Sequence, residues 1–257
     1  MTKMIISRNK TVIPACDVKR EKFEEMIKVT GDIQAIYAYK VGSSLALQLG
    51  LPAIVRMVEC GAGKIVIYDH QKAGTDIHEK TPGKFMDTMA DAGVKAVILF
   101  PQSGPVSEYE WIRAAQERDL GVIVGGEMTH PRYLEGDFSE GKKNYTDIFH
   151  SLGIERQLTG FIRLGAPEDM YEIAARMGVA DFVVPGNKVD KIKHYKELIE
   201  RCGIVQPVFY SPGLIAQGGQ ISESSKAAGD YWHAIIGREI YENPDMRKAA
   251  LELCSQI

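Results

Sequence analysis

The segment Pro207–Gly219, PVFYSPGLIAQGG, is a short apolar run that ends in a glycine-rich loop. Tyr231–Arg238, YWHAIIGR, repeats this order, with an apolar run followed by glycine and arginine. Loops that follow parallel strands lie at the ligand-binding end of a barrel or an open sheet. There, glycine backbone N–H groups converge on an anion and an arginine fork matches phosphate oxygens. Each motif alone is often a tight turn or a surface charge, but together they predict a phosphate site on an α/β fold.

Six further apolar runs precede these two, and amphipathic segments with apolar residues three and four apart lie between the runs. The predicted strands are Thr11–Cys16, Ile33–Val41, Lys64–Asp69, Lys95–Phe100, Gly121–Met128, Asp181–Pro185, Pro207–Tyr210 and Tyr231–Ile236. The predicted helices are Arg20–Thr30, Leu45–Cys60, Pro82–Ala92, Ser107–Arg118, Glu168–Met177, Lys188–Arg201 and Ser222–Ala228. This strict alternation predicts an α/β fold of the (βα)8 TIM barrel type, with an open doubly wound sheet as the alternative.

One stretch, residues 131–165, departs from the repeat between the fifth strand and its helix. It contains a polar run, Glu135–Asn144, and a helix-like segment, Tyr145–Leu152. Connections of this length are usually functional lids or variable insertions, and we expect one of the two here. Thr159–Leu164 is a further possible strand. The length of 257 residues otherwise predicts a single barrel domain over residues 1–257.

Composition excludes several classes of partner. The formal net charge of −3 and the pI of about 6.1 give no electrostatic reason to expect nucleic acid or an anionic membrane. Four scattered cysteines without ligand spacing predict reduced thiols and no zinc site. Neither a signal peptide nor a long apolar stretch is evident. We therefore expect a cytoplasmic protein.

Charged residues mark the ends of the first three predicted strands, with Asp17 just after the first, Lys40 at the end of the second and Asp69 at the end of the third. Lys72 and Asp76 lie just beyond Asp69. Lys40 and Asp69 each follow four apolar or aromatic residues, which is not typical of strand ends that face water. A buried charge is strongly disfavoured unless an opposite charge pairs with it. The alternating signs therefore predict a paired array at the mouth of the barrel, with ordinary solvated strand ends as the alternative.

These residues belong to a set of motifs that follow one another across Thr11–Tyr241. The set comprises Pro14-Ala15-Cys16-Asp17, Tyr39-Lys40-Val41-Gly42, Asp69 to Ile77, Glu127-Met128-Thr129-His130-Pro131, Val184-Pro185-Gly186, Ser211-Pro212-Gly213, Gln217-Gly218-Gly219 and Ile236-Gly237-Arg238. In content and order they resemble the orotidine 5′-monophosphate decarboxylase family. The resemblance implies a barrel that forms homodimers with active sites at the interface, and catalysis that uses neither a metal nor an organic cofactor.

The resemblance also implies a role for each residue in decarboxylating orotidine 5′-monophosphate to uridine 5′-monophosphate, a step of pyrimidine biosynthesis. Lys40, Asp69, Lys72 and Asp76 would form the catalytic array, with Lys72 as the acid and Asp76 reaching the partner's site. The remaining residues would bind substrate: Asp17 the ribose, Thr129 the pyrimidine edge, Gln217, Gly237 and Arg238 the phosphate, with further contacts from Ile77, Thr81, Pro185, Pro212 and Gly218.

The chemistry fits such an array. Loss of CO2 from C6 of the pyrimidine leaves electron density on carbon, which a fixed ammonium group stabilises and then protonates. Flanking carboxylates keep that ammonium group charged and correctly aimed.

One departure from the family pattern concerns the third strand. The usual motif is Asp-x-Lys-x-x-Asp, whereas Asp69, Lys72 and Asp76 have one extra residue in each gap. Side chains two apart on a strand share a face, so this spacing would aim Asp69 and Lys72 apart unless a bulge or turn intervenes. Gly74 makes such a bulge or turn plausible, and a bulge is the favoured interpretation. In the alternative, Gln71 occupies the place of the catalytic lysine.

Two other functions remain open from the sequence. One is a magnesium-dependent aldolase of the same superfamily, similar to hexulose-phosphate synthase, in which the acidic residues would hold the metal. The other is a non-catalytic relative that binds a nucleotide through the phosphate site alone. No metal is expected at His70 or His78, because neither lies in a metal-ligand pattern.

Overall fold

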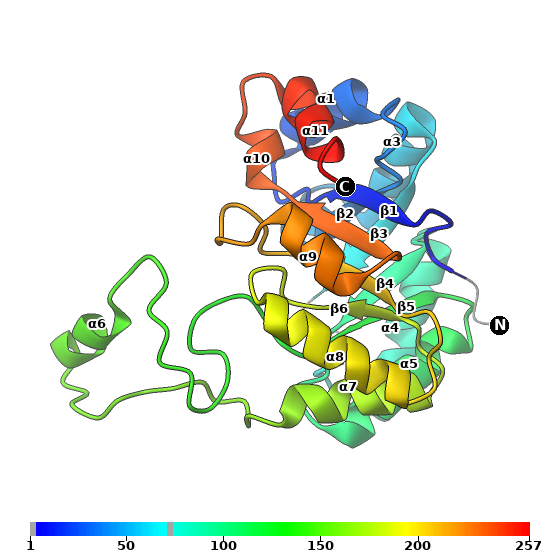
Figure 1. Cartoon of the computed structure of the whole chain (residues 1–257). Coiled ribbons are helices and arrows are strands. Elements are labelled where there is room, and N and C mark those ends of the chain that lie inside the picture. The colour runs from blue at the N-terminus through cyan, green and yellow to red at the C-terminus, as the bar shows by residue number, and fades with distance from the viewer. Residues whose placement is uncertain (1–3, 71–73) are drawn as a thin grey trace.

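Eight parallel strands alternate with helices in the computed structural model, which describes residues 4–70 and 74–257 (Figure 1). The strands are β1 (Lys10–Pro14), β2 (Ala38–Gly42), β3 (Ile65–Asp69), β4 (Ala96–Leu99), β5 (Gly121–Gly125), β6 (Asp181–Val183), β7 (Val208–Ser211) and β8 (Trp232–Ile236). They pair in the order β1-β8-β7-β6-β5-β4-β3-β2. All eight predicted strands are therefore found, most of them with shorter ends.

The first and last strands of this order, β1 and β2, meet through single bridges instead of a regular ladder. Val12 N donates to Ala35 O over 2.9 Å and Cys16 N donates to Lys40 O over 2.8 Å. These bonds bring the two edges of the sheet together in a nearly closed barrel, so the predicted TIM barrel is confirmed. They also place the carboxyl end of β1 beside Lys40.

The helices cover the outside of the barrel, except α6, which lies on the arm formed by residues 131–165. They are α1 (Arg20–Thr30), α2 (Ser43–Leu49), α3 (Leu51–Ala62), α4 (Thr81–Asp91), α5 (Pro105–Gln116), α6 (Tyr145–Ser151), α7 (Ala166–Arg176), α8 (Val189–Arg201), α9 (Ile221–Ala228), α10 (Arg238–Tyr241) and α11 (Met246–Cys254). The single helix expected at Leu45–Cys60 is wrong. Gly50, with φ of 74°, separates α2 from α3 at a bend of 95°. Within the described ranges, no single helix has the length and apolar character to cross a membrane, although this bent pair passes the same test.

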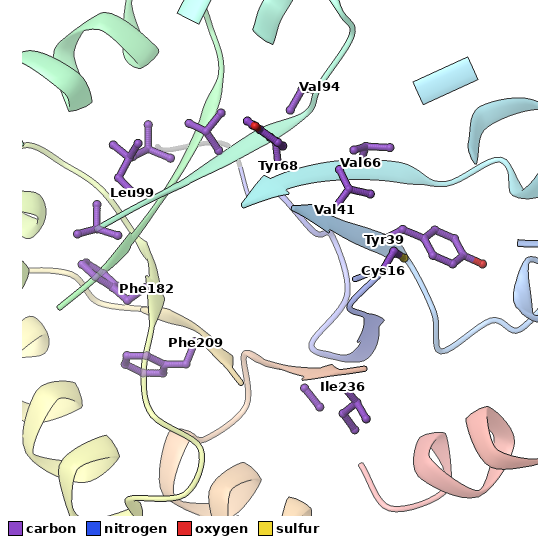
Figure 2. Close-up of a cluster of buried hydrophobic side chains, with 14 of the residues drawn as sticks. Cys16, Tyr39, Val41, Val66, Tyr68, Val94, Leu99, Phe182, Phe209 and Ile236 are labelled. Atoms are coloured by element: carbon purple, nitrogen blue, oxygen red, sulfur yellow. The ribbon is translucent and has the colours of Figure 1, made fainter. Parts of the chain in front are cut away.

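Alternate strand residues face the barrel interior and the helices. Tyr39, Val41, Val66 and Tyr68 belong to the cluster between strands and helices, part of which is drawn in Figure 2. Ala38 and Ile67 belong to a second cluster that fills the barrel. By the period of two, the side chains of Lys40 and Asp69 share the inner face with these residues. The strand pattern itself therefore directs both charges into the barrel.

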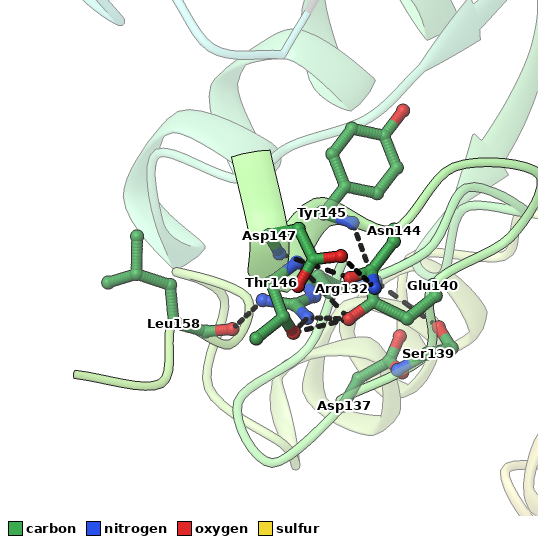
Figure 3. Close-up of polar contacts among 9 residues, drawn as sticks. All are labelled: Arg132, Asp137, Ser139, Glu140, Asn144, Tyr145, Thr146, Asp147 and Leu158. Carbon is green, nitrogen blue, oxygen red and sulfur yellow. Dashed lines mark hydrogen bonds and ion pairs between the residues drawn. The ribbon is translucent and has the colours of Figure 1, made fainter. Parts of the chain in front are cut away.

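Residues 131–165 form an arm that leaves the barrel after β5, with α6 at the far left of Figure 1. Arg132 organises this arm (Figure 3). Its guanidinium pairs with Glu140 and donates to Thr146 Oγ1 over 2.6 Å and to Leu158 O over 2.8 Å. The strand considered at Thr159–Leu164 is wrong, because only a single bridge, Leu134 to Ile162, forms there.

Inside the barrel, Asp181 is a buried carboxyl group that accepts a hydrogen bond from Tyr210 Oη over 2.8 Å. Burial raises the pKa of Asp181 to about 7. The folded state therefore favours the protonated acid, and this contribution to stability is lost as pH rises from about 4, the unfolded value, through about 7.

We expect Asp181→Asn to be more stable than the wild type by a few kcal/mol above pH 7, at about 1.4 kcal/mol per pKa unit. The amide keeps the oxygen that Tyr210 binds but carries no charge to bury. Thermal unfolding of both proteins between about pH 5 and about pH 8 measures the gap, which should widen as pH rises. A gap independent of pH would show that Asp181 does not titrate in this range.

Candidate active site

A cavity of about 260 Å³ opens at the carboxyl ends of the barrel strands. Its lining includes eight of the predicted site residues: Asp17, Lys40, Asp69, Thr129, Pro212, Gln217, Gly237 and Arg238. These residues come from the ends of five strands, β1, β2, β3, β7 and β8, and from the segment that follows β5. The fold thus gathers into one cavity side chains that are far apart in the sequence.

The charged centre of the cavity is a buried ion pair between Lys40 and Asp69. Lys40 Nζ lies 2.7 Å from Asp69 Oδ2, and the two side chains are only 10% and 13% exposed. Asp17 Oδ2 lies 3.9 Å from the same ammonium group, but its side chain is 54% exposed. Burial acts to lower the pKa of Lys40, yet the charges of Asp69 and Asp17 and the hydrogen bond from Lys40 to Asp69 raise it overall. Lys40 is therefore held as a cation.

One carboxylate oxygen of Asp69 accepts no hydrogen bond from the described residues. This atom, Oδ1, is buried and has no hydrogen-bond partner among residues 4–70 and 74–257. A buried carboxylate oxygen without a donor is costly, so a second donor at this position would be stabilising. Lys72, the predicted acid, lies outside the described residues, as does Gln71, its alternative. Because β3 ends at Asp69, the strand period does not by itself decide between them.

The segment that follows is anchored on α5. Gly74 has φ of 90°, a left-handed conformation that favours glycine, and its carbonyl oxygen accepts from Ser103 Oγ over 3.0 Å. The carbonyl oxygen of Asp76 accepts from Ser107 Oγ over 3.2 Å and from Trp111 Nε1 over 3.4 Å. The backbone around Asp76 is therefore fixed against α5 and the loop before it, while the Asp76 side chain remains exposed.

Among the predicted site residues that the structure describes, five are absent from the lining of this cavity. They are Asp76, Ile77, Thr81, Pro185 and Gly218. Ile77 is 66% exposed, an unusual position for a large apolar side chain beside a ligand cavity. Asp76 and Ile77 are thus exposed and do not line the cavity of their own chain.

The loops after β7 and β8, where the sequence predicts a phosphate site, both contribute to the cavity. Gly213, with φ of 83°, has no room for a side chain, since a Cβ atom there would lie 2.6 Å from Thr129 and 2.8 Å from Gln217 Oε1. Arg238 is exposed and forms no ion pair with any other residue that the structure describes. The two motifs that predicted a phosphate site therefore meet at one end of the same cavity.

Glu127, for which the sequence motifs predict no role of its own, also lines the cavity and is 2% exposed. Lys188 Nζ lies 2.6 Å from Glu127 Oε1, and Tyr195 Oη donates to Glu127 Oε2. Asn187 Nδ2 donates to Thr129 O over 3.3 Å, which ties the loop after β6 to that after β5. The motif Glu127-Met128-Thr129 was the only sequence feature that pointed to this region. Lys188 and Tyr195 are distant from Glu127 in sequence, so their contacts with it could not be predicted.

Among the described residues, no group of three or more His, Cys, Asp and Glu side chains is arranged to hold a metal ion.

Comparison with known proteins gives one consistent result. Orotidine 5′-phosphate decarboxylase of Methanosarcina mazei is 28% identical over 254 residues, which is 98% of this chain and 97% of the relative. The protein of the same name from Methanococcoides burtonii is 26% identical over 91% of this chain and 92% of the relative. The resemblance expected from the motifs is confirmed by these relatives. No family model matches the chain.

Solved structures agree on the fold. Orotidine 5′-monophosphate decarboxylase of Methanocaldococcus jannaschii, in complex with the inhibitor BMP, has a TM-score of 0.74 at 21% identity and covers 97% of this chain, with 99% of that chain aligned. Orotidine 5′-phosphate decarboxylase of Pyrococcus horikoshii has a TM-score of 0.71 at 24% identity, over 96% of this chain and 99% of that one.

Proposed function

We propose that this chain, a homologue of the orotidine 5′-phosphate decarboxylases over nearly its whole length, converts orotidine 5′-monophosphate to uridine 5′-monophosphate and CO2. One observation carries the proposal beyond homology. The buried Lys40–Asp69 pair opens into the same cavity as Gln217 and Arg238. This substrate requires a charged centre that faces its pyrimidine and an anion-binding site for its phosphate group.

Catalysis is proposed to depend on charge held in place before the substrate arrives. Lys40, paired with Asp69, fixes the carboxylate so that Oδ1 remains available. We propose that Lys72, as a cation, donates to that acceptor and stabilises the carbanion that forms at C6 as CO2 leaves. Its proton then passes to C6, which completes the product. This scheme needs neither a metal nor an organic cofactor.

The site is proposed to be shared between two copies of the chain. Asp76 and Ile77 are exposed and do not line the cavity of their own chain. Hydrogen bonds from Ser107 and Trp111 nevertheless hold the Asp76 backbone firmly. A fixed backbone with an outward carboxylate suits a residue that completes a partner's site in an isologous dimer.

Arg238 and Gln217 form the proposed phosphate site, called here the phosphate grip. Arg238→Ala removes a charge-assisted fork worth about 1.5–3 kcal/mol, so KM for the substrate should rise roughly tenfold to a hundredfold. Arg238→Lys keeps the charge but loses the fork, so its KM should lie between those of the wild type and Arg238→Ala. Steady-state kinetics measure all three proteins. An unchanged KM in Arg238→Ala would place this side chain outside the binding site.

The proposed function is tested by following the ultraviolet absorbance of orotidine 5′-monophosphate with purified protein in excess EDTA. We expect turnover that neither EDTA nor added Mg²⁺ changes. Turnover that requires Mg²⁺ would contradict the metal-free scheme. Binding of uridine 5′-monophosphate without any turnover would identify a non-catalytic relative and refute the proposed activity.

A further inference from the structure

An acidic side chain, Glu239, lies within the phosphate end of the cavity, where a negative charge is unexpected. It follows Arg238 in the first turn of α10 and lines the same cavity as Gln217. A carboxylate beside a phosphate site lowers its affinity for an anion by repulsion. We therefore expect Glu239 to make another contact that offsets this loss of affinity.

The contact that Glu239 makes indicates this role. Its Oε1 atom accepts a hydrogen bond from Ala216 N over 2.9 Å. Ala216 directly precedes Gln217 in the loop after β7, whereas Glu239 follows β8. This charge-assisted bond joins the two halves of the phosphate grip, and such bonds are about twice as strong as neutral ones.

The loop that Glu239 holds is strained. Ile215, next to Ala216, has φ of 59°, a left-handed conformation that is a genuine outlier for a β-branched residue. The loop is closed on itself by Ile215 N donating to Gly219 O over 2.7 Å and Gly218 N donating to Ile215 O over 2.8 Å. Strain of this kind persists only where neighbouring interactions fix the backbone.

We infer that Glu239 is a positioning residue, which holds the strained loop Leu214–Gly219 in the shape that presents Gln217 to the phosphate. This inference rests on the proposed function and extends it. Glu239 touches the loop backbone and acts on the substrate through Gln217. Its negative charge is tolerated because the bond to Ala216 keeps the grip formed before the substrate arrives.

Steady-state kinetics of Glu239→Ala and Glu239→Gln test the inference. Glu239→Ala should raise KM about tenfold to a hundredfold, since it removes a charge-assisted bond, while kcat changes little. Glu239→Gln keeps an acceptor oxygen and should remain within about threefold of the wild-type KM. Glu242→Ala, an exposed acid at the end of the same turn, is the matched control and should leave KM unchanged.

Repeating the Glu239→Ala substitution in the Ile215→Gly variant tests whether Glu239 acts by holding the strained loop. Ile215→Gly removes the cost of the left-handed conformation, so in this background Glu239→Ala should raise KM by only about threefold or less. A fall of KM in Glu239→Ala would show that Glu239 competes with the phosphate and would overturn the inference. Equal effects in both backgrounds would also overturn it.

Failure of the inference can be distinguished from failure of the proposed function. An inactive wild-type protein refutes the decarboxylase proposal, and hydrogen exchange at the Ala216 amide then decides the role of Glu239. We expect that amide to exchange at least about tenfold faster in Glu239→Ala than in the wild type, with equal thermal stability of the two proteins. Unchanged exchange would refute the positioning role whatever the activity.

Discussion

Mixing Lys72→Ala protein with Asp76→Ala protein, each nearly inactive alone, is expected to restore about a quarter of the wild-type rate per total subunit. Random exchange makes about half of the dimers mixed, and one of the two sites in each mixed dimer has both wild-type residues. Each single variant should lose at least about a thousandfold in kcat, because it removes a charge that acts on the transition state. The exposed carboxylate of Asp76 is the structural basis for this expectation.

The control for this experiment is the doubly substituted chain, Lys72→Ala with Asp76→Ala, mixed with wild-type protein. Its mixed dimers contain no site with both wild-type residues, so mixing should add no activity to that of the remaining wild-type dimers. Native mass spectrometry verifies that subunits have exchanged. Exchange without recovery in the first mixture would contradict the shared site and place Asp76 in its own chain's site or in neither.

Replacing Lys40 by methionine is expected to cost both stability and activity. The change leaves Asp69 buried without its counterion, which destabilises a protein by about 3–5 kcal/mol. It should also lower kcat by roughly 10²–10³-fold, because the proposed mechanism requires Lys40 to hold Asp69 in place beside the reacting carbon. Chemical denaturation measures the first effect and steady-state kinetics measure the second.

The double variant Lys40→Met with Asp69→Leu separates these two effects. Replacing both members of a buried pair by apolar residues is often neutral, so stability should return towards the wild-type value. Activity should remain as low as in Lys40→Met or fall further, because the array itself is gone. Activity that recovers together with stability would show that the Lys40–Asp69 pair has only a structural role.

Much of the barrel was predictable because its signals are local. Eight apolar runs separated by amphipathic segments specify alternating strands and helices, and the alternation within Ile65–Asp69 specifies which side chains face inward. Lys40 and Asp69 could be paired from the sequence because each lies near the end of an apolar strand and their charges are opposite. The same reasoning brought Gln217 and Arg238 to one end of the barrel.

The features that the sequence did not predict depend on contacts between distant segments or on single backbone angles. Gly50 splits one amphipathic helix into two, since apolar periodicity continues across the bend. The arm at 131–165 is ordered by Arg132, whose partners are spread over the whole insertion. Glu239 gave no signal because its partner is the backbone of Ala216. The apolar residues of Thr159–Leu164 suggested a strand, but the barrel does not cover them.

The central claim, one charged array despite the longer spacing from Asp69 to Asp76, is tested most directly by a crystal structure with uridine 5′-monophosphate bound. We predict that Lys72 Nζ lies within about 3.5 Å of Asp69 Oδ1 and faces C6 of the pyrimidine, with Asp76 of a second copy close to the same ammonium group. Lys72 directed into solvent, with Gln71 in its place beside Asp69, would contradict the account.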